Sequence, residues 1–441
     1  MAISYQRATA YLSSLMQKHG VEELARRLRP KPGELPPSLP GHSRIDEEQV
    51  GQRWSLLPAA ETARPQLLDA QTTAQMEVYE RNIESFVGTA KIPVGIAGPL
   101  RVNGLFAQGD YYVPLATTEA ALVASYSRGA KIISESGGAS AALLSEGVSR
   151  APAFVFANLE ELGRFLQWAM EHEEQIQKAA EDTSAHAKLV DLEVTVDGRH
   201  VYFLFVFNTG DAAGQNMVTF ATNAAVVWIK ENTPVKPRTV YLEANFSGDK
   251  KASALSLQRV RGKKVVADAH LPRELVEAEL HTIPEAMAEC ARLGLLGSVL
   301  SGTLGAQAHF ANALAALFIA CGQDAACVAE AAIGTTNIEV ESNGGLYVAV
   351  TLPNLIVGTV GGGTKLPSQQ ACLRIMGLAG AGHAQAFAEV AASLCLAGEV
   401  SLTAAVCAGH FARAHAKLAR GRDIPFLPEE GTEVYFSHEW R

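Results

Sequence analysis

The hydrophobic and polar positions of the first eighty residues follow the period of amphipathic helices. From Tyr5 to Leu28, apolar side chains recur every three or four positions and share one face of a helix. The proline-rich stretch at residues 29–40 cannot continue that helix. Residues 44–83 have a polar, helical pattern again. The pattern therefore predicts an N-terminal helical region with a linker, which we place at residues 1–82.

After residue 83 the pattern changes, because residues 93–100 have the proline and glycine content of a turn segment. A strand-like run follows at residues 109–115 and a long helix of small residues at 120–134. Thr117 and Thr118 precede Glu119, which is typical of a helix start with a threonine cap and an acid in the first turn. On this segment alone, a capping role and a catalytic role explain Glu119 equally well.

Residues 152–239 are richer in aromatic and β-branched residues. The pattern predicts a strand at 154–156, a helix at 159–180, strands at 187–196 and 200–207 joined by an Asp197-Gly198 turn, and a helix that ends near Asn232. The order strand-helix-strand-strand-helix-strand is that of a ferredoxin-like domain. We place this small α/β domain at residues 151–242, inserted into a large domain made of residues 83–150 and 243–423.

The rest of the large domain alternates helices of small residues with strands. We expect strands at 346–352 and 354–358, a last helix from about Ser401 to Arg420, and a tail at 424–441. The uncharged stretch 293–323 contains glycines and polar residues, so it predicts buried helices and no membrane span. The expected fold class is α+β: a large, mostly helical domain with a central sheet, an inserted ferredoxin-like small domain and an N-terminal helical region.

Composition narrows the function classes. The 441 residues, 48% hydrophobic and 19% charged, indicate a folded chain of more than one domain. The 37 Lys+Arg against 46 Asp+Glu argue against a nucleic-acid partner. Residues 1–29 lack the apolar segment of a secretory signal, so we expect a cytoplasmic protein without a membrane partner. The six cysteines form no CxxC pair and the twelve histidines no ligand spacing, which predicts reduced core thiols and no metal site.

The first candidate for chemistry is Gly248-Asp249-Lys250-Lys251, which places two ammonium groups behind a carboxylate in a short polar loop. A lysine beside a carboxylate stays protonated and can direct its charge at a developing oxyanion. Taken alone, such a pair is more often solvated surface. Three further segments put a single acid or a glycine run into apolar, small-residue surroundings, where charge is normally avoided: residues 116–119, 322–326 and 358–364.

Together and in this order, these segments resemble the catalytic part of the 3-hydroxy-3-methylglutaryl-CoA reductases over roughly residues 83–420. The matching stretches also include Ile92–Leu100 and Gly210–Met217. The Asp249-Lys250-Lys251 loop and the segment 322–326 resemble the class that occurs in eukaryotes, archaea and some bacteria. The resemblance implies a two-step, four-electron reduction of the acyl thioester to mevalonate and CoA. A reductase of a different acyl thioester and a non-catalytic ligand-binding relative of the same fold are the alternatives.

The resemblance implies four catalytic residues. Lys250 would hold the charge on the thioester oxygen, and Asp324 would keep that lysine oriented and charged. Glu119 would supply a proton to the substrate, and His415 would protonate the departing CoA thiolate. We assign this role to His415 and not to His410, because the family motif has its acid there and a helix C-terminus favours an imidazolium.

The resemblance also implies NADPH as the cofactor, with NADH as a second cofactor that this chain could use. Eukaryotic members carry Ser-Arg where this chain has Phe207-Asn208, so no arginine stands there to bind the 2′-phosphate, and Lys365 is the substitute cation. The residues assigned to the cofactor are Asp211, Gly214, Gln215, Asn216, Met217, Gly361, Gly362, Gly363 and Lys365.

For the substrate, the resemblance implies a set of polar residues that surround the acyl group and CoA: Glu84, Ser125, Arg128, Arg150, Asp249, Lys251 and Asn312. Glu243 stands where the family usually has a serine that touches the acyl group. The resemblance further implies a homodimer or higher homo-oligomer whose active site is shared between two chains.

Overall fold

The computed structural model describes residues 4–41 and 43–409, and the chain divides into two compact units, residues 1–89 and 90–441. The first unit is helical, as predicted, with six elements: α1 (Tyr5–His19), α2 (Val21–Leu28), α3 (Glu47–Leu56), α4 (Ala60–Leu67), α5 (Ala70–Ala74) and the 3₁₀ helix η1 (Met76–Tyr79). Its small core contains Ile45, Val50, Trp54, Met76 and Phe86, whereas α1 and α2 bury none of their residues. This unit is therefore held together by residues 45–87.

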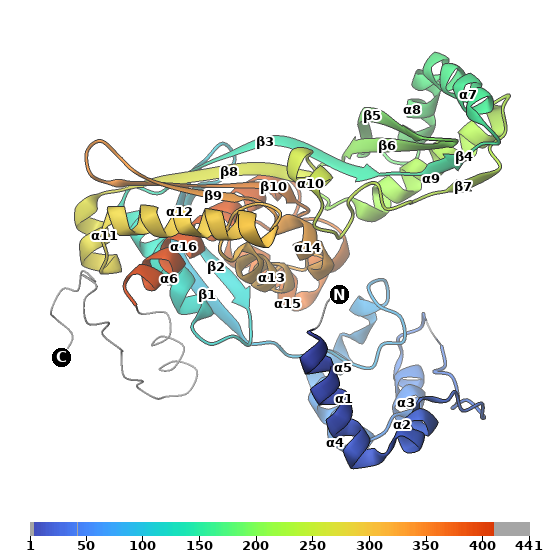
Figure 1. Cartoon of the computed structure of the whole chain (residues 1–441), viewed down its shortest axis with the longest axis horizontal. Coiled ribbons are helices and arrows are strands. Elements are labelled where there is room, and N and C mark those ends of the chain that lie inside the picture. The colour runs from blue at the N-terminus through green and yellow to red at the C-terminus, as the bar shows by residue number, and fades with distance from the viewer. Residues whose placement is uncertain (1–3, 42, 410–441) are drawn as a thin grey trace. The chain divides into compact units, whose positions relative to one another are not determined.

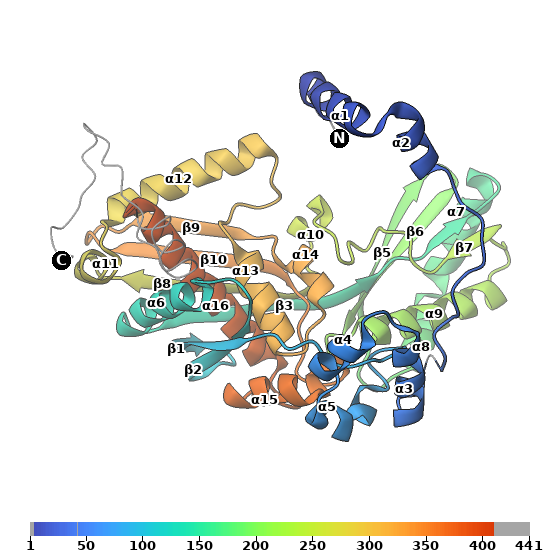
Figure 2. The same ribbon diagram turned by 90° about the horizontal axis from the view of Figure 1, so that it is seen from below.

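The second unit is built on a mixed sheet (Figures 1 and 2). Six of its strands are β1 (Val94–Gly104), β2 (Gln108–Ala116), β3 (Ala139–Arg150), β8 (Gly262–Leu271), β9 (Thr335–Val340) and β10 (Leu346–Leu355). The order is β3-β8-β10-β9, and β1 pairs with both β2 and β3. The predicted strand at residues 109–115 is confirmed as β2, and the two strands expected at 346–358 are one, β10.

The turn predicted at residues 93–100 is wrong, because most of this segment lies in β1. Of the prolines and glycines that suggested a turn, Gly98 and Pro99 lie where the β1–β2 register shifts, between Ala97 and Leu100. A proline donates no ladder hydrogen bond, so it is tolerated at such an irregularity. Pairing with β2 on both sides keeps the segment extended.

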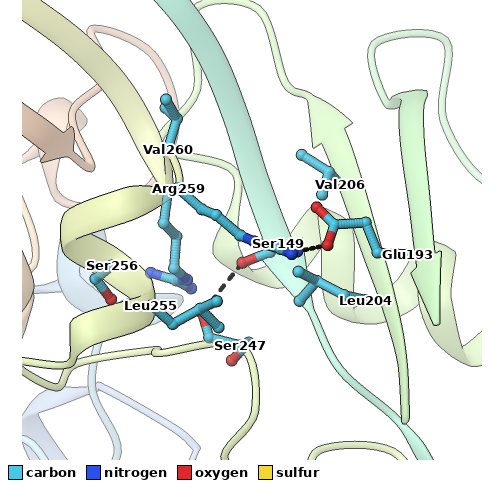
Figure 3. A pocket seen from close by; sticks show the side chains of 10 residues that line it. Ser149, Glu193, Leu204, Val206, Ser247, Leu255, Ser256, Arg259 and Val260 are labelled. Carbon is cyan, nitrogen blue, oxygen red and sulfur yellow. Dashed lines mark hydrogen bonds and ion pairs between the residues drawn. The ribbon is translucent and has the colours of Figure 1, made fainter. Parts of the chain in front are cut away.

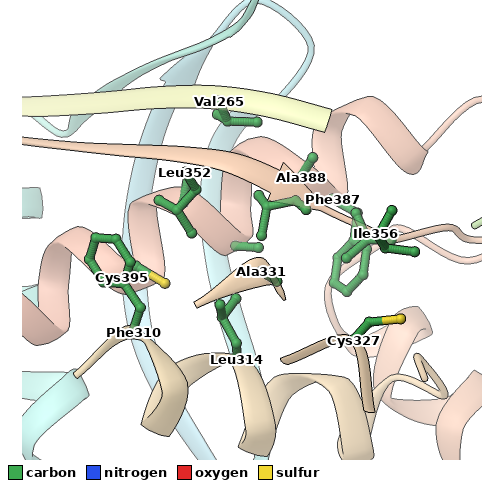
Figure 4. Close-up of a cluster of buried hydrophobic side chains, with 14 of the residues drawn as sticks. Val265, Phe310, Leu314, Cys327, Ala331, Leu352, Ile356, Phe387, Ala388 and Cys395 are labelled. Carbon is green, nitrogen blue, oxygen red and sulfur yellow. The ribbon is translucent and has the colours of Figure 1, made fainter. Parts of the chain in front are cut away.

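Helices α6 (Leu122–Glu135), α13 (Phe310–Ala320) and α16 (Ala384–Cys407) pack against this sheet. Figure 4 shows side chains of α13 and α16 meeting Val265 of β8 and Leu352 of β10 in one core. Among the described residues, α16 is the one helix long and apolar enough to cross a membrane, yet 83% of that window is buried in the fold. Burial of this kind is typical of a core helix.

The last helix in the described part of the chain differs from the predicted helix at residues 401–420, of which residues 401–409 are described. α16 begins at Ala384 and ends at Cys407, followed by Gly409 in a left-handed conformation with φ of 64°. The apolar run that starts at Ala384 was too uniform to show a helical period, so its beginning was missed. Residues 410–441 lie outside the described part of the chain.

A second set of strands continues from the end of β3 (Figure 1). It contains β4 (Ala153–Val155), β5 (Lys188–Asp197), β6 (His200–Asn208) and β7 (Thr239–Tyr241), in the antiparallel order β7-β4-β6-β5. Helices α7 (Leu159–Glu171), α8 (Glu173–Glu181) and α9 (Gln215–Asn232) accompany it. The strand order is that of a ferredoxin-like sheet. The helix expected at 159–180 is two helices, because His172 has a non-helical conformation.

The remaining elements connect these parts: α10 (Ala254–Gln258), α11 (Arg273–Leu280), α12 (Pro284–Ser301), η2 (Ala325–Cys327), α14 (Val328–Ala331), η3 (Gly362–Lys365) and α15 (Pro367–Ile375). Contrary to expectation, α12 is not buried, and it exposes Leu293, Leu295, Leu296, Val299 and Leu300. All six cysteines are free, as predicted. Four are buried, whereas Cys290 and Cys407 are partly exposed, so the core-thiol prediction is wrong for these two.

Candidate active site

Two of the segments singled out in the sequence are fixed to each other by a buried amide. The side chain of Gln323 donates to the carbonyl oxygen of Gly358 at 3.0 Å and accepts from its N–H at 2.8 Å. Beside this contact the backbones of Gly322 and Gly363 touch, so that a Cβ on Gly322 would lie 2.3 Å from the Gly363 oxygen. Only glycine permits this approach, which explains why both segments are glycine-rich.

The segment 210–217 joins the same place. The N–H of Thr359 donates to the Asp211 carbonyl oxygen at 2.9 Å. The Asp211 carboxylate accepts from the N–H groups of Gly382 at 2.8 Å and Ala384 at 3.2 Å, so it holds the start of α16. As predicted, the segment opens a helix, since α9 begins directly after Gly214 with φ of 78°. A helix N-terminus is a favourable place for an anionic group.

Lys250 meets Asp324 at the centre of this cluster, with 2.9 Å between Nζ and Oδ2. The hydrogen bond to Asp324 raises the pKa of Lys250, and partial burial opposes this only in part. Burial by itself would raise the pKa of Asp324, but hydrogen bonds from Lys250 and the Ala326 N–H hold it below its ordinary value. Gln215 Nε2 also lies 3.4 Å from Asp324 Oδ2. The pair is thus charged on both sides at neutral pH.

Three of the predicted substrate residues extend the cluster. Arg150 Nη1 lies 3.2 Å from Glu243 Oε2 and 3.1 Å from Asp249 Oδ2, and its Nη2 lies 3.4 Å from the carbonyl oxygen of Gln215. Lys251 Nζ donates to the Asp249 carbonyl oxygen at 2.7 Å. The structure therefore brings Arg150, Asp249 and Lys251 together with the Lys250–Asp324 pair.

Glu119 does not cap a helix, so the capping interpretation is wrong. α6 begins only at Leu122, and Ala121, with φ of 71°, occupies the cap position. The Glu119 N–H donates to Thr117 Oγ1 at 3.0 Å, and the residue is exposed. A short turn formed by the threonine hydroxyl takes the place of the expected cap, which leaves the carboxylate at the surface.

The other predicted residues have different contacts or positions, or lie outside the described part. Ser125 and Arg128 of α6 both contact Ser401 of α16, at 2.9 Å between the two hydroxyls and 2.6 Å from Arg128 Nη2 to the carbonyl oxygen. Asn312 lies in the first turn of α13, and Lys365 is exposed at the end of η3. Glu84 belongs to the first unit, and His410 and His415 lie outside the described residues.

Sequence reasoning missed two charged residues behind the loop. Glu330 is 0% and Arg261 2% exposed, and Arg261 Nη1 lies 2.7 and 2.6 Å from the two Glu330 oxygens. A signal was present, because Glu330 is a single acid in an apolar, small-residue run, as Asp324 is.

Arg261 also lines a cavity of about 30 Å³. Ser149 and Ser247, which line the same cavity, are labelled in Figure 3. Ligand pockets commonly measure about 300–1,000 Å³, so this cavity is too small for a substrate.

Sequence comparisons place this geometry among known proteins. Residues 49–420 match the family model described as hydroxymethylglutaryl-coenzyme A reductase. The chain is 44% identical over 351 residues to the 3-hydroxy-3-methylglutaryl-coenzyme A reductase of Pyrococcus horikoshii, covering 78% of this chain and 85% of that protein. The enzyme of the same name from Haloferax volcanii is 42% identical over 377 residues, covering 82% and 93%.

Among solved structures, the fold is similar to that of a class II 3-hydroxy-3-methylglutaryl-CoA reductase from Streptococcus pneumoniae, described as bound to NADPH in open conformations. The TM-score is 0.61 at 19% identity, covering 80% of this chain and 98% of that one. At this identity the likeness concerns the fold alone, and it agrees with the mixed helix-and-sheet architecture described above.

Proposed function

Because the chain belongs to the hydroxymethylglutaryl-coenzyme A reductase family, we propose that the cluster around Lys250 is the centre at which it reduces 3-hydroxy-3-methylglutaryl-CoA to mevalonate and CoA. NADPH, when bound, supplies a hydride in each of the two reduction steps. The observation that carries the proposal is the ion pair of Lys250 with Asp324, at 2.9 Å.

Lys250 stabilises the oxygen on which charge develops. When the thioester carbonyl is reduced, its oxygen becomes an alkoxide, and a fixed ammonium group lowers the energy of that state. Asp324 keeps the ammonium protonated and oriented before the reaction begins, so no reorganisation is needed during it. Arg150, Asp249 and Lys251, which adjoin the pair, are suited to bind the polar acyl group.

Two proton donors complete the reaction. Breakdown of the hemithioacetal expels a CoA thiolate, and we assign its protonation to His415, which lies outside the described residues. Reduction of the aldehyde creates a second alkoxide, and we assign its proton to Glu119. The exposure of Glu119 leaves its carboxyl group open to a bound substrate.

The glycine segments fit a dinucleotide. Gly361 and Gly362 have φ of 74° and 48°, and a Cβ at either position would meet nothing within 4 Å. Backbone of this kind lets a ligand approach closely, and the start of α9 favours a phosphate. We propose that Asp211, Gly214–Met217, Gly361–Gly363 and Lys365 hold NADPH.

Selectivity for the 2′-phosphate rests on Lys365 in this proposal. Thr209 is buried and its hydroxyl already donates to the Ala212 carbonyl oxygen at 2.9 Å, while Asn208 Oδ1 accepts from Gly210. Lys365 is exposed at the end of η3 and can place a positive charge near the phosphate. We expect NADH to be a weaker second cofactor.

The remaining substrate residues are proposed by family resemblance: Ser125, Arg128, Asn312 and Glu84. Glu243 does not take the place of a substrate contact, because its carboxylate accepts from Asn245 N–H at 2.7 Å, from Ser247 Oγ at 3.0 Å and from Arg150 at 3.2 Å. It organises the turn before the catalytic loop. This supports 3-hydroxy-3-methylglutaryl-CoA over a different acyl thioester.

At the level of domains and partners, we propose that residues 151–242 form a cofactor-binding domain within a large domain of residues 83–150 and 243–423. We also propose a cytoplasmic homodimer or higher homo-oligomer. The exposed leucines of α12 support the oligomer, because a contiguous apolar surface is typical of an interface.

The test is the replacement of Lys250 by alanine. Purified protein is incubated with 3-hydroxy-3-methylglutaryl-CoA and NADPH or NADH, and the loss of reduced cofactor is followed by absorbance. We expect Lys250→Ala to lower kcat roughly 10²–10³-fold without unfolding the protein. Lys131→Ala is the control, because Lys131 forms a comparable pair with Glu279, at 2.6 Å, on α6 and α11. Normal turnover by folded Lys250→Ala would exclude this centre.

A further inference from the structure

One short segment of the chain holds Lys250 at two points. Asp324 contacts its side chain, with 2.9 Å between Oδ2 and Nζ. Six residues later, Glu330 of α14 accepts the backbone N–H of Lys250 at 3.1 Å. The ammonium group and the peptide that carries it are therefore fixed by two carboxylates of the same segment.

The backbone of Lys250 needs such support. Its φ of 56° lies in the left-handed region, which non-glycine residues adopt at a cost of roughly 1–3 kcal/mol. A residue in this conformation keeps it only where the surroundings fix the peptide on either side. This conformation sets the direction in which the Lys250 side chain leaves the loop.

Glu330 is itself fixed by Arg261. Both groups are almost fully buried, and Arg261 Nη1 lies within 2.7 Å of each Glu330 oxygen. Arg261 Nη2 also lies 2.9 Å from Oδ1 of Asp249, the residue before Lys250. The Arg261 guanidinium group thus connects Glu330, which accepts the Lys250 N–H, to the side chain of Asp249.

Asn354 joins this arrangement to the sheet. It is 0% exposed, its Oδ1 accepts from the Arg261 N–H at 3.0 Å, and its Nδ2 donates to the carbonyl oxygens of Ser256 at 2.7 Å and Glu330 at 3.5 Å. Because Asn354 belongs to β10, the frame around Lys250 is continuous with the rigid central sheet.

Fold stability alone gives a weak reason for these buried charges. Burial raises the pKa of Glu330, and the Arg261 charge only partly offsets this. Buried ion pairs are often replaced by apolar residues of similar volume without loss of stability. The Arg261–Glu330 pair is costly to bury and touches both Asp249 and Lys250. Its presence is therefore better explained by its role in fixing the loop that carries Lys250.

We propose that Glu330 and Arg261 are positioning residues that orient Lys250 for reduction of the thioester, an inference that rests on the function proposed above for Lys250. Their effect passes through the Lys250 peptide and the Asp249 side chain, and neither group needs to touch the substrate.

The experiment compares Glu330→Ala and Glu330→Gln with Glu389→Ala as the matched control. Glu389 is also 0% exposed and also accepts backbone N–H groups, those of Leu105, Phe106, Ala107 and Leu143, but it belongs to α16. We expect Glu330→Ala to lower kcat about 100-fold, in the range seen when an oxyanion stabiliser is lost, with little change in KM for NADPH. Glu330→Gln keeps an oxygen for the Lys250 N–H and should recover about tenfold of that loss.

A second readout does not depend on activity. Hydrogen exchange of the Lys250 amide should be faster in Glu330→Ala than in Glu389→Ala, whereas the melting temperature should fall in both. Equal exchange rates, or a kcat of folded Glu330→Ala within about threefold of wild type, would overturn the proposal. If Glu330→Ala does not fold, Glu330→Gln decides, since unchanged kcat and exchange in that variant would also overturn it. A different result is normal turnover by Lys250→Ala together with faster exchange of the Lys250 amide in Glu330→Ala. That result would refute the proposed function of Lys250, whereas the support that Glu330 gives to the Lys250 peptide would stand.

Discussion

At the scale of single residues, the proposed site depends on one ammonium group whose charge a neighbouring carboxylate maintains. Because the pKa of Lys250 is raised, its stabilising contribution is present below the ordinary lysine value and is lost as the pH rises through the raised pKa. The pKa of Asp324 is lowered, so its contribution is present above the ordinary aspartate value and is lost as the pH falls through the lowered pKa. The pair is therefore intact across the whole neutral range.

Removing the carboxylate should move the alkaline limit of activity. In Asp324→Asn the hydrogen bond and charge that raise the pKa of Lys250 are lost, while its partial burial, which lowers that pKa, remains. We expect the alkaline limb of the kcat profile to shift to lower pH and kcat at neutral pH to fall. The profile should be measured from pH 6 to about one unit above the ordinary lysine value of about 10.4, with Asp110→Asn, a surface ion-pair variant, as the control. If the alkaline limb does not shift in Asp324→Asn, the ionisation of a group other than Lys250 determines it.

At the scale of elements, close approach of two helices supports the second unit. α6 contacts α16 through Gly129, where an added Cβ would lie 1.8 Å from the carbonyl oxygen of Ala397. A backbone carbonyl group cannot move aside as the end of a flexible side chain can. The packing of the two helices therefore requires glycine at position 129. The contact also places Ser125 and Arg128 against Ser401.

Two alanine substitutions, one at this contact and one away from it, should change the stability in opposite directions. Gly129→Ala should destabilise the protein by roughly 1–3 kcal/mol, the usual cost of overpacking. Gly163→Ala should stabilise it by up to about 1 kcal/mol, because Gly163 lies inside α7 and an added Cβ would meet nothing within 4 Å. Chemical denaturation of both variants gives the two free energies. A neutral Gly129→Ala would show that the helices can move apart without cost.

The two partly exposed cysteines are Cys290, which belongs to α12, and Cys407, the last residue of α16. Cys407 Sγ lies 3.4 Å from the Ala286 carbonyl oxygen, one turn before Cys290. A hydrogen bond from Cys407 stabilises the Cys290 thiolate and lowers the pKa of Cys290 to about 7. Among cysteines, a lowered pKa and exposure mark the reactive ones.

We therefore expect Cys290 to be alkylated by iodoacetamide before the other thiols, with a rate that rises with pH through about 7. In Cys407→Ala the donor is lost, so the pH at half-maximal rate should move up toward the ordinary value of about 8.5. Peptide mass spectrometry identifies the modified residue. Cys372→Ala, which removes a different thiol, should leave the Cys290 profile unchanged.

At the scale of the whole molecule, the exposed side of α12 indicates assembly. Leu293, Leu296 and Leu300 share one helix face and are 55%, 47% and 88% exposed. Such a surface is costly in water and favours a second copy of the chain. We expect the double variant Leu296→Lys/Leu300→Lys to be monomeric by analytical ultracentrifugation. Leu159→Lys, which changes an exposed leucine of α7, should keep the native oligomer; a monomeric wild-type protein would refute the assembly.

The sequence predicted much of the secondary structure and chemistry. Helical period located the N-terminal helices, and aromatic and β-branched content located β5 and β6. The Asp-Lys-Lys loop and the acid in the Gly-Gln-Asp segment were recognised from charge in unusual surroundings, and they form the Lys250–Asp324 pair.

Local pattern failed where distant contacts decide. β1 is a strand because it pairs with β2, despite its proline and glycines, and the start of α16 is hidden in a uniformly apolar run. Residue types and their order, which the chain itself carries, determined the chemistry of reduction. Only tertiary structure decided that Glu330 would meet both the Lys250 peptide and Arg261, because residues 80 and 69 positions apart come together through sheet pairing and burial and not through any local period.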